Sequence, residues 1–117
     1  MRHQSESKRV GRPRGQHIAL LRTLAASVIL YESVRTTRAK AKLVKPVVER
    51  LITKAKKGNA VSAIRELNRF LIDQKASQKV MKELVPRYKE RSSGYLRVTA
   101  LGFRSGDAAP MVRIELV

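Results

Sequence analysis

The residues best suited to chemistry in this chain of 117 residues are cations in one short stretch. The segment VRTTRAKAK, residues 34–42, has two threonines where a helix would begin, followed by Arg38, Lys40 and Lys42. Such cations are unfavourable at a helix N-terminus, because the helix dipole already places partial positive charge there. The free backbone N–H groups and these side chains would instead form a cradle for a phosphate group, and the hydroxyls of Thr36 and Thr37 would cap the helix or join that cradle. The stretch therefore predicts an anion-binding site.

Catalytic side chains do not cluster in the sequence. His3 and His17 have no acidic residue at useful spacing, and Asp107 and Glu115 stand alone rather than in a carboxylate cluster. The chain has no cysteine, and its glycines match no nucleotide-binding loop. We therefore predict a non-enzymatic protein with no metal, no cofactor and no small-molecule substrate; a nuclease has little support.

The net charge indicates the kind of partner. Lys and Arg number 26 against 9 Asp and Glu, which gives a formal charge of +17. This charge opposes a compact state unless a polyanion neutralises it, so nucleic acid is the first partner to consider. An anionic membrane would need a helix with a wide exposed apolar face, whereas each apolar face here has a plausible core partner. The sequence also lacks a signal peptide and any run of about 20 apolar residues, which predicts a cytoplasmic protein that does not bind membranes.

Charge and composition divide the chain into an arm and a domain. Residues 1–57 hold 15 basic and 3 acidic residues, against 11 and 6 in residues 58–117, so the first half is favoured for anion binding. Residues 1–17 contain almost no apolar side chain and are predicted to be a basic arm that orders on nucleic acid, or else a solubilising tail. Residues 18–117 are predicted to form one globular domain.

Hydrophobic periodicity predicts the elements of that domain. Residues 18–31 read as a buried central helix and the stretch SVRTT, residues 33–37, as a strand. A second helix starts with Thr36 or Thr37 as its N-cap and runs to Lys57, with a kink or break near Pro46. Around this second helix, Arg38, Lys42, Lys45 and Lys56 fall on one stripe, flanked by Arg50, Lys54 and Lys57. The apolar residues of the helix face the other way, so it can pack on a core and present cations outward.

Two further helices and two strands complete the prediction. Asn59 would cap a helix with Val61, Ile64, Leu67 and Leu71 on its core face. Asp73 or Ser77 would open the next helix, which ends at Pro86. Alternation places Leu96, Val98 and Ala100 inward on one strand and Val112, Ile114 and Leu116 inward on the other. The expected fold is α+β in two layers, with a small mixed sheet packed on helices.

Aromatic content bears on the type of nucleic acid. The chain has two Phe, three Tyr and no Trp, so it lacks the stacking platforms of most proteins that read single strands. We therefore expect it to contact the backbones of a folded or double-helical partner. Structured RNA and duplex DNA fit this expectation equally well.

Several short motifs together resemble one family. These are MRH at the start, GR at 11–12, HIALLRTLAASVIL at 17–30, RTT with KAK at 35–42, LITKAKKG at 51–58, and SGY, GDAAPM and IELV near the end. In this order they resemble the L-seventeen family of bacterial large-subunit ribosomal proteins. The resemblance implies a non-enzymatic component of the large ribosomal subunit, with the order helix, strand, three helices, two strands. It also implies contact with ribosomal RNA, and with neighbouring proteins on the solvent side near the nascent-chain exit.

The predicted RNA-binding residues combine the charge pattern with this resemblance. Matching family positions are occupied by Arg2, His3, Arg12, His17 and Arg22. The other predicted contacts are Lys8, Arg9, Arg14, Arg35, Thr36, Thr37, Arg38, Lys40, Lys42, Lys45, Lys54, Lys56, Lys57 and Arg104. The alternative function is a nucleoid-type DNA-binding protein, which would share the charge but has no evident use for the GDAAPM hairpin.

Overall fold

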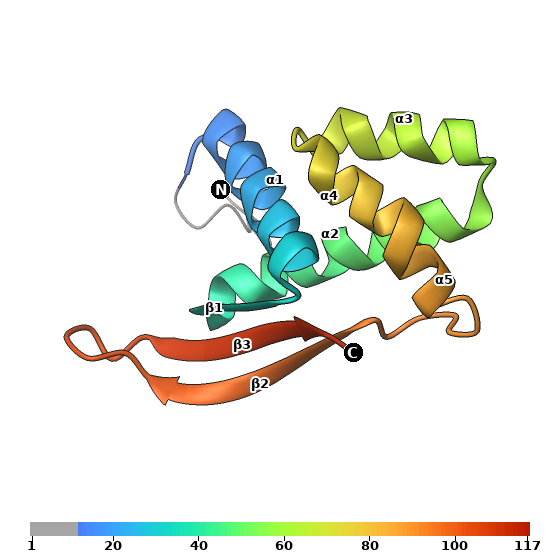
Figure 1. Cartoon of the computed structure of the whole chain (residues 1–117). Helices are drawn as coiled ribbons and strands as arrows, with labels where there is room; N and C mark the ends of the chain where they lie inside the picture. Colours follow the sequence, from blue (N-terminus) through green and yellow to red (C-terminus); the bar gives the residue numbers. More distant parts are fainter. Residues whose placement is uncertain (1–11) are drawn as a thin grey trace, which may run out of the picture.

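The computed structural model describes residues 12–117 and shows helices packed over one face of a small sheet (Figure 1). It confirms the predicted α+β class and the order of the elements. In chain order these are α1 (Arg14–Tyr31), β1 (Ser33–Thr37), α2 (Arg38–Lys57), α3 (Ala60–Phe70), α4 (Gln74–Lys79), the π-helical turn η1 (Val80–Leu84), α5 (Val85–Arg87), β2 (Leu96–Phe103) and β3 (Pro110–Leu116). The segments α4, η1 and α5 follow one another directly and together form the last predicted helix.

The sheet has the order β1-β3-β2, and both strand pairs are antiparallel. The predicted mixed sheet is therefore wrong. Strands β2 and β3 form a hairpin, and β1 pairs along the other edge of β3. Strands β1 and β2 run in the same direction, but β3 separates them and no parallel pair forms.

The core lies between the inner face of the sheet and the helices. It is built from fully buried side chains of several elements, among them Val28, Ile29, Val44, Val48, Ile52, Val80, Leu84 and Ile114. Burying each side chain of this size stabilises the fold by about 1.5–3 kcal/mol. The central helix is α2 rather than the predicted α1, because α2 contacts all three strands as well as α1, α3, η1 and α5.

Helix α1 begins at Arg14, four residues before the predicted start at Ile18. Pro13 is the N-cap residue, and its carbonyl accepts a hydrogen bond of 2.9 Å from the backbone N–H of His17. A backbone N–H group at the start of a helix has no acceptor within the helix. Proline lacks this group, so it sacrifices no hydrogen bond there. Arg14 and His17 therefore belong to the first turn of α1 and not to the arm.

Helix α2 runs from Arg38 to Lys57 with Pro46 inside it, so the predicted break is absent. Proline removes one backbone hydrogen bond from a helix. Here Pro46 is exposed, while Val44 and Val48 on either side of it are fully buried. Packing of these two valines holds the helix together across the proline.

The core face of α3 differs from the prediction. Asn59 caps this helix as expected, since its Oδ1 accepts a hydrogen bond of 3.0 Å from the N–H of Val61. The buried residues of α3, however, are Ala63 and Leu67, whereas Val61 is 56% exposed and Ile64 is 42% exposed. The helix packs on α2 and α4 through a face rotated from the one that the largest apolar residues suggested.

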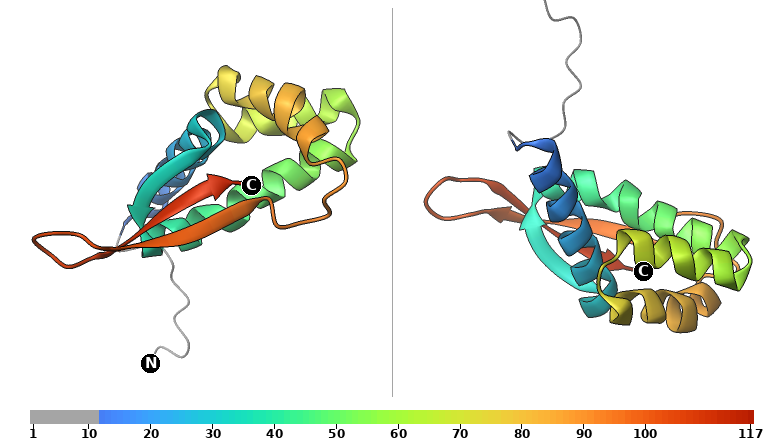
Figure 2. Two further views of the ribbon diagram at one scale, coloured as in Figure 1. Left: turned by 60° about the horizontal axis from the view of Figure 1, so that its bottom comes forward. Right: turned by 90° about the horizontal axis from the view of Figure 1, so that it is seen from above.

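Strand β2 also departs from its predicted burial. Leu96 is buried, but Val98 and Ala100 on the same inner face are exposed. Strand β3 follows the prediction, with Val112 and Ile114 buried. Figures 1 and 2 show that the tip of the β2–β3 hairpin projects beyond the helices. Val98 and Ala100 line an open groove between β2 and the first half of α2, so no helix covers them closely.

Candidate nucleic-acid interface

The starts of α1 and α2 and the tip of the β2–β3 hairpin all lie at one end of the molecule, on the left in Figure 1. This arrangement brings together cations that are distant in the sequence. The second half of α2, with α3 and α5, lies toward the opposite end. The predicted RNA-binding residues therefore divide between two ends of the molecule.

The first half of α2 carries cations that are free of acidic partners. Arg38 and Lys42 are exposed, and Lys40 and Lys45 are half-buried. No carboxylate in residues 12–117 forms a salt bridge with any of these four side chains, and the first turn of α2 contains no acidic residue. Four neighbouring positive charges are thus left to an external anion.

The two threonines before α2 have different environments. Thr37 is the N-cap residue, as predicted, but its hydroxyl makes no capping hydrogen bond. It remains half-buried at the start of the helix. Thr36 is 8% exposed on the inner side of β1, opposite Val112 of β3. Alternation along the strand turns the Thr36 side chain toward the inner side of the sheet, and its contact with a phosphate group stays a prediction.

The last turns of α2 use their cations inside the protein. The ammonium group of Lys56 donates hydrogen bonds to the carbonyl of Arg91 and, at 3.0 Å, to the hydroxyl of Tyr95. It also lies 5.0 Å from the centre of the Tyr95 ring. These contacts engage the ammonium group of Lys56 in joining α2 to the segment before β2, and its RNA contact stays a prediction.

Lys54 and Lys57 lie near Lys56 but remain exposed. Lys54 forms a salt bridge of 3.6 Å with Glu66 of α3, and both side chains are more than half exposed. An exposed pair of this kind contributes at most about 1 kcal/mol. Lys57 lies at the C-terminus of α2, where a cation is favourable because of the helix dipole. Both residues are thus separated from the cations at the start of the helix.

An open groove runs between the first half of α2 and the hairpin. Its volume is about 730 Å³. Three cations of α2 line one side of it: Arg38, Lys42 and Lys45. The other lining residues are apolar or glycine: Ala41, Val98, Ala100, Gly102, Phe103, Pro110, Met111 and Val112. One side of the groove is therefore basic, and the rest of its lining is apolar.

Arg104 lies in the hairpin loop and is paired within it. Its Nε lies 3.1 Å from Oδ1 of Asp107, and a second hydrogen bond joins its guanidinium to Oδ2. The Arg104 guanidinium, together with the backbone N–H of Ala109, lowers the pKa of Asp107 to about 2 and the pair raises the pKa of Arg104. Asp107 thus partly offsets the positive charge of Arg104. Arg104 is therefore expected to contribute less to anion binding than an unpaired arginine would.

Arg12, Arg14 and His17 lie at or just before the start of α1, and Arg22 lies near its middle. Arg14 is exposed, whereas Arg12, His17 and Arg22 are half-buried. Nδ1 of His17 and Nε of Arg22 are buried without a hydrogen-bond partner among the described residues. The guanidinium of Arg22 lies 5.7 Å from the centre of the Phe70 ring, which fixes its position against α3. The predicted residues Arg2, His3, Lys8 and Arg9 lie outside the described part of the chain.

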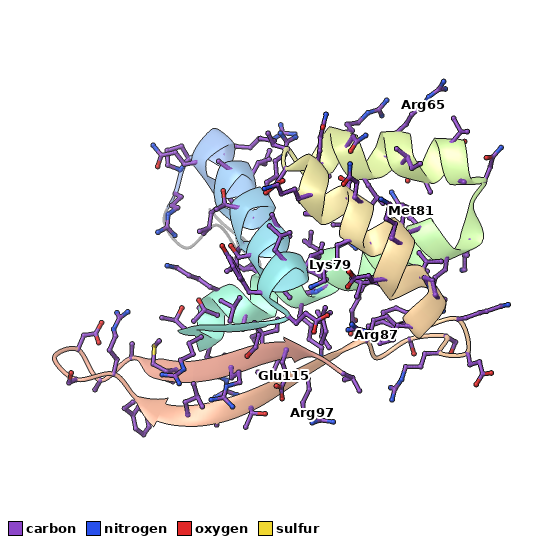
Figure 3. The ribbon with its side chains drawn as sticks, viewed as in Figure 1. Arg65, Lys79, Met81, Arg87, Arg97 and Glu115 are labelled. Atoms are coloured by element: carbon purple, nitrogen blue, oxygen red, sulfur yellow. The ribbon has the colours of Figure 1, made fainter. Side chains whose placement is uncertain are left out.

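The outer face of the sheet holds the predicted residue Arg35 and two further cations, Arg97 and Arg113, that were not among the predicted contacts. Arg35 lies opposite Arg113, and Arg113 lies opposite Thr99. Arg97 is on the same face, forms a 3.9 Å salt bridge with Glu115, and points away from the helices in Figure 3. Like charges directly opposite each other are unfavourable without an anion. The alternation that buried Val112 and Ile114 also predicts this arginine face.

The described residues hold neither a metal-binding group of side chains nor a membrane-spanning helix. Across positions 12–117, no three or more His, Cys, Asp or Glu side chains are grouped so that they could hold a metal ion. In the same range, no helix combines the length and apolar character needed to span a membrane.

Comparisons with known proteins identify the family of the chain. Residues 20–117 match the family described as Ribosomal protein L17. The chain is 41% identical to the large ribosomal subunit protein bL17 of Petrotoga mobilis, over 100% of this chain and 97% of that protein. It is 44% identical to bL17 of Orientia tsutsugamushi, with 80% of that protein covered, and 42% identical to the longer bL17 of Geotalea daltonii, with 64% covered. The chain belongs to the ribosomal protein L17 family.

Proposed function

We propose that the protein is a structural constituent of the large ribosomal subunit that binds and stabilises folded ribosomal RNA. Its relatives are named as proteins of that subunit, so the role is non-enzymatic and is carried out in the cytoplasm, within the ribosome. The observation that carries the RNA-binding part is the start of α2, where four cations have no acidic partner among the described residues.

The proposed interface is centred on Arg38, Lys40, Lys42 and Lys45. Phosphate groups would neutralise these side chains and accept hydrogen bonds from the N–H groups of the first turn of α2, which removes the unfavourable dipole interaction. Arg35 and Thr37 lie just before this turn, and Arg104 lies in the neighbouring hairpin loop. Further contacts are proposed for Arg12, Arg14, His17, Arg22, Lys54 and Lys57 and for the arm residues Arg2, His3, Lys8 and Arg9.

Neighbouring proteins of the large subunit are proposed as additional partners. Val61 and Ile72 are 56% and 78% exposed, and both lie away from the groove beside the start of α2. Exposed apolar side chains on a ribosomal protein suit contacts with other proteins. A position on the solvent side, near the nascent-chain exit, is part of this proposal and follows from the family resemblance.

Sedimentation of a cell lysate tests the proposed function. After a moderate-salt wash, the wild-type chain should travel stoichiometrically with the large ribosomal subunit when its amount is measured across the gradient. The double variant Arg38→Glu, Lys42→Glu should be incorporated poorly. The control Arg65→Glu, Lys82→Glu changes the net charge equally on α3 and η1 and should be incorporated normally. Figure 3 shows Arg65 directed away from the rest of the molecule.

The same gradient separates the alternatives. Wild-type protein that sediments with DNA would support a nucleoid-type protein and contradict the ribosomal role. Equal incorporation of both double variants would contradict the placement of the interface on α2.

A further inference from the structure

Phe103 has an unusual position for one of the two phenylalanines of a small protein. Its side chain is 79% exposed, and Val98 and Leu101 of the same strand are each 41% exposed. Contact between an apolar ring and water is unfavourable, so a partner that covered the ring would gain free energy. The ring also lies near the most basic part of the chain, at the end of the groove lined by Arg38, Lys42 and Lys45.

A β-bulge turns Phe103 toward this groove. Ala100 lies opposite Val112, but Gly102 lies opposite Met111, so Leu101 is an extra residue in β2. Strict alternation from Val98 and Ala100 would place Phe103 on the outer face. The bulge shifts the register by one residue, which puts Phe103 opposite Pro110 on the groove side.

The backbone around the ring is held in place. Gly102 has φ +106°, a conformation that a residue with a side chain rarely adopts. On the other side, Arg104 is locked to Asp107, and its backbone N–H donates a 2.8 Å hydrogen bond to the carbonyl of Ala109. The ring of Phe103 is therefore presented from a fixed strand end and not from a loose loop.

We infer that the groove binds an unpaired nucleotide of an RNA strand, with the base against Phe103 and Val98 and its phosphate groups on Arg38, Lys42 and Lys45. Base stacking on an exposed ring beside a basic groove is the general mode of single-strand binding. The groove volume of about 730 Å³ lies in the range of about 300–1,000 Å³ typical of ligand sites.

Charge complementarity selects this occupant. Among the described residues that line the groove, three are cations and none is acidic. The occupant must therefore supply both negative charge and a flat apolar surface, and a nucleotide carries both in one unit. The inference rests on the proposed RNA-binding function and adds a contact to a base, which backbone binding alone does not require.

Binding of two short oligonucleotides to the full-length chain tests the inference. One probe is a fluorescent single-stranded oligoadenylate, and the other is an abasic oligonucleotide with the same number of phosphates. Wild-type protein should bind the oligoadenylate about tenfold more tightly at the same salt concentration. Phe103→Ala should lose this preference and leave the affinity for the abasic probe unchanged. Phe103→Tyr should retain it.

The controls separate the base contact from charge and from folding. Ile72→Ala also removes an apolar side chain, 78% exposed, that does not line the groove, and it should keep the preference. Lys42→Ala should weaken binding of both probes. Far-UV circular dichroism of Phe103→Ala should match wild type, because the ring is largely exposed.

Two results would overturn the inference. The first is a wild-type protein that binds both probes equally, or a Phe103→Ala variant that keeps the preference. The second is displacement of the oligoadenylate from wild-type protein by a Glu- and Leu-rich peptide whose own binding is lost in Phe103→Ala, which would identify the groove as a protein site. In both cases co-sedimentation with the large subunit could persist, so the proposed function is judged separately.

Discussion

The two ends of helix α2 carry the same kind of side chain and use it differently. At the start, Arg38 and Lys42 extend from a turn with no acidic residue and have no salt bridge with a described residue. At the end, Lys56 is bonded to Arg91 and Tyr95, and Lys54 pairs with Glu66. The cations at one end thus have no acidic partner among the described residues, and those at the other end are paired within the protein.

The helix dipole gives this difference a direction. Cations in the last turn interact favourably with the partial negative charge of the C-terminus, whereas cations in the first turn are opposed by the dipole. The end of α2 therefore contributes to stability in the free protein, and we propose that the start contributes to binding. Cations outside α2 are also paired within the protein. Glu32 accepts a 2.8 Å hydrogen bond from Arg87 and lies 3.4 Å from Lys79.

Charge reversal at the start of α2 should have the largest effect. The double variant Arg38→Glu, Lys42→Glu removes two charge-assisted contacts, each worth about 1.5–3 kcal/mol, so affinity for ribosomal RNA should fall by about a hundredfold or more. The free protein should become slightly more stable, because the new carboxylates suit the helix N-terminus. Filter binding and chemical denaturation measure the two quantities. If the double variant lost stability but kept its affinity for RNA, the start of α2 would serve stability and not RNA binding.

Removal of the internal lysine should have the opposite pattern. Lys56→Met keeps most of the side-chain volume but loses the hydrogen bonds to Arg91 and Tyr95, so the free energy of unfolding should fall by about 2 kcal/mol. RNA affinity of the folded variant should stay within about twofold of wild type. Urea unfolding followed by circular dichroism measures the first value. Unchanged stability with weaker RNA binding would show that Lys56 belongs to the interface after all.

Acid should weaken the protein partly through Glu32. The hydrogen bond from Arg87 lowers the pKa of Glu32 below its ordinary value of 4.5, despite some desolvation. The contribution of Glu32 is therefore present above that ordinary value and is lost as the pH falls through the lowered pKa. Because the pair is substantially exposed, Glu32→Gln should cost only about 0.5–1 kcal/mol at neutral pH.

The pH dependence of this variant provides the check. The stability difference between wild type and Glu32→Gln should shrink as the pH falls from 4.5 through the lowered pKa of Glu32, because the carboxyl group then becomes uncharged like the amide. A difference that stays constant down to acid pH would assign the effect to packing. RNA affinity at neutral pH should not change.

The exposed pair at the end of α2 should have the smallest effect. Lys54→Ala breaks the 3.6 Å contact with Glu66 and should change the free energy of unfolding by less than about 0.5 kcal/mol. If Lys54 also contacts RNA, the dependence of log affinity on log salt should decrease by about one unit. If the slope stayed unchanged, Lys54 would lie outside the interface, which would then be confined to the first half of α2.

Local signals in the sequence predicted much of the fold. Asn59 and Asp73 cap the helices that they were expected to begin, and the alternation of Val112 and Ile114 was confirmed. The net charge and the motifs predicted the family. These features depend on residues within a few positions of each other, or on composition, so they can be recognised in a single chain.

The rest depends on neighbours that are distant in the sequence. Lys56 meets Tyr95 across 39 positions, and Val98 stays exposed because an open groove separates β2 from α2 at this point. The bulge at Leu101 decides which face Phe103 takes, and it exists only in the pairing of β2 with β3. The sequence by itself determined the helices, the strands and the excess of positive charge. Tertiary structure decided which cations are left for RNA, because burial and pairing are properties of the folded surface and not of the residue type.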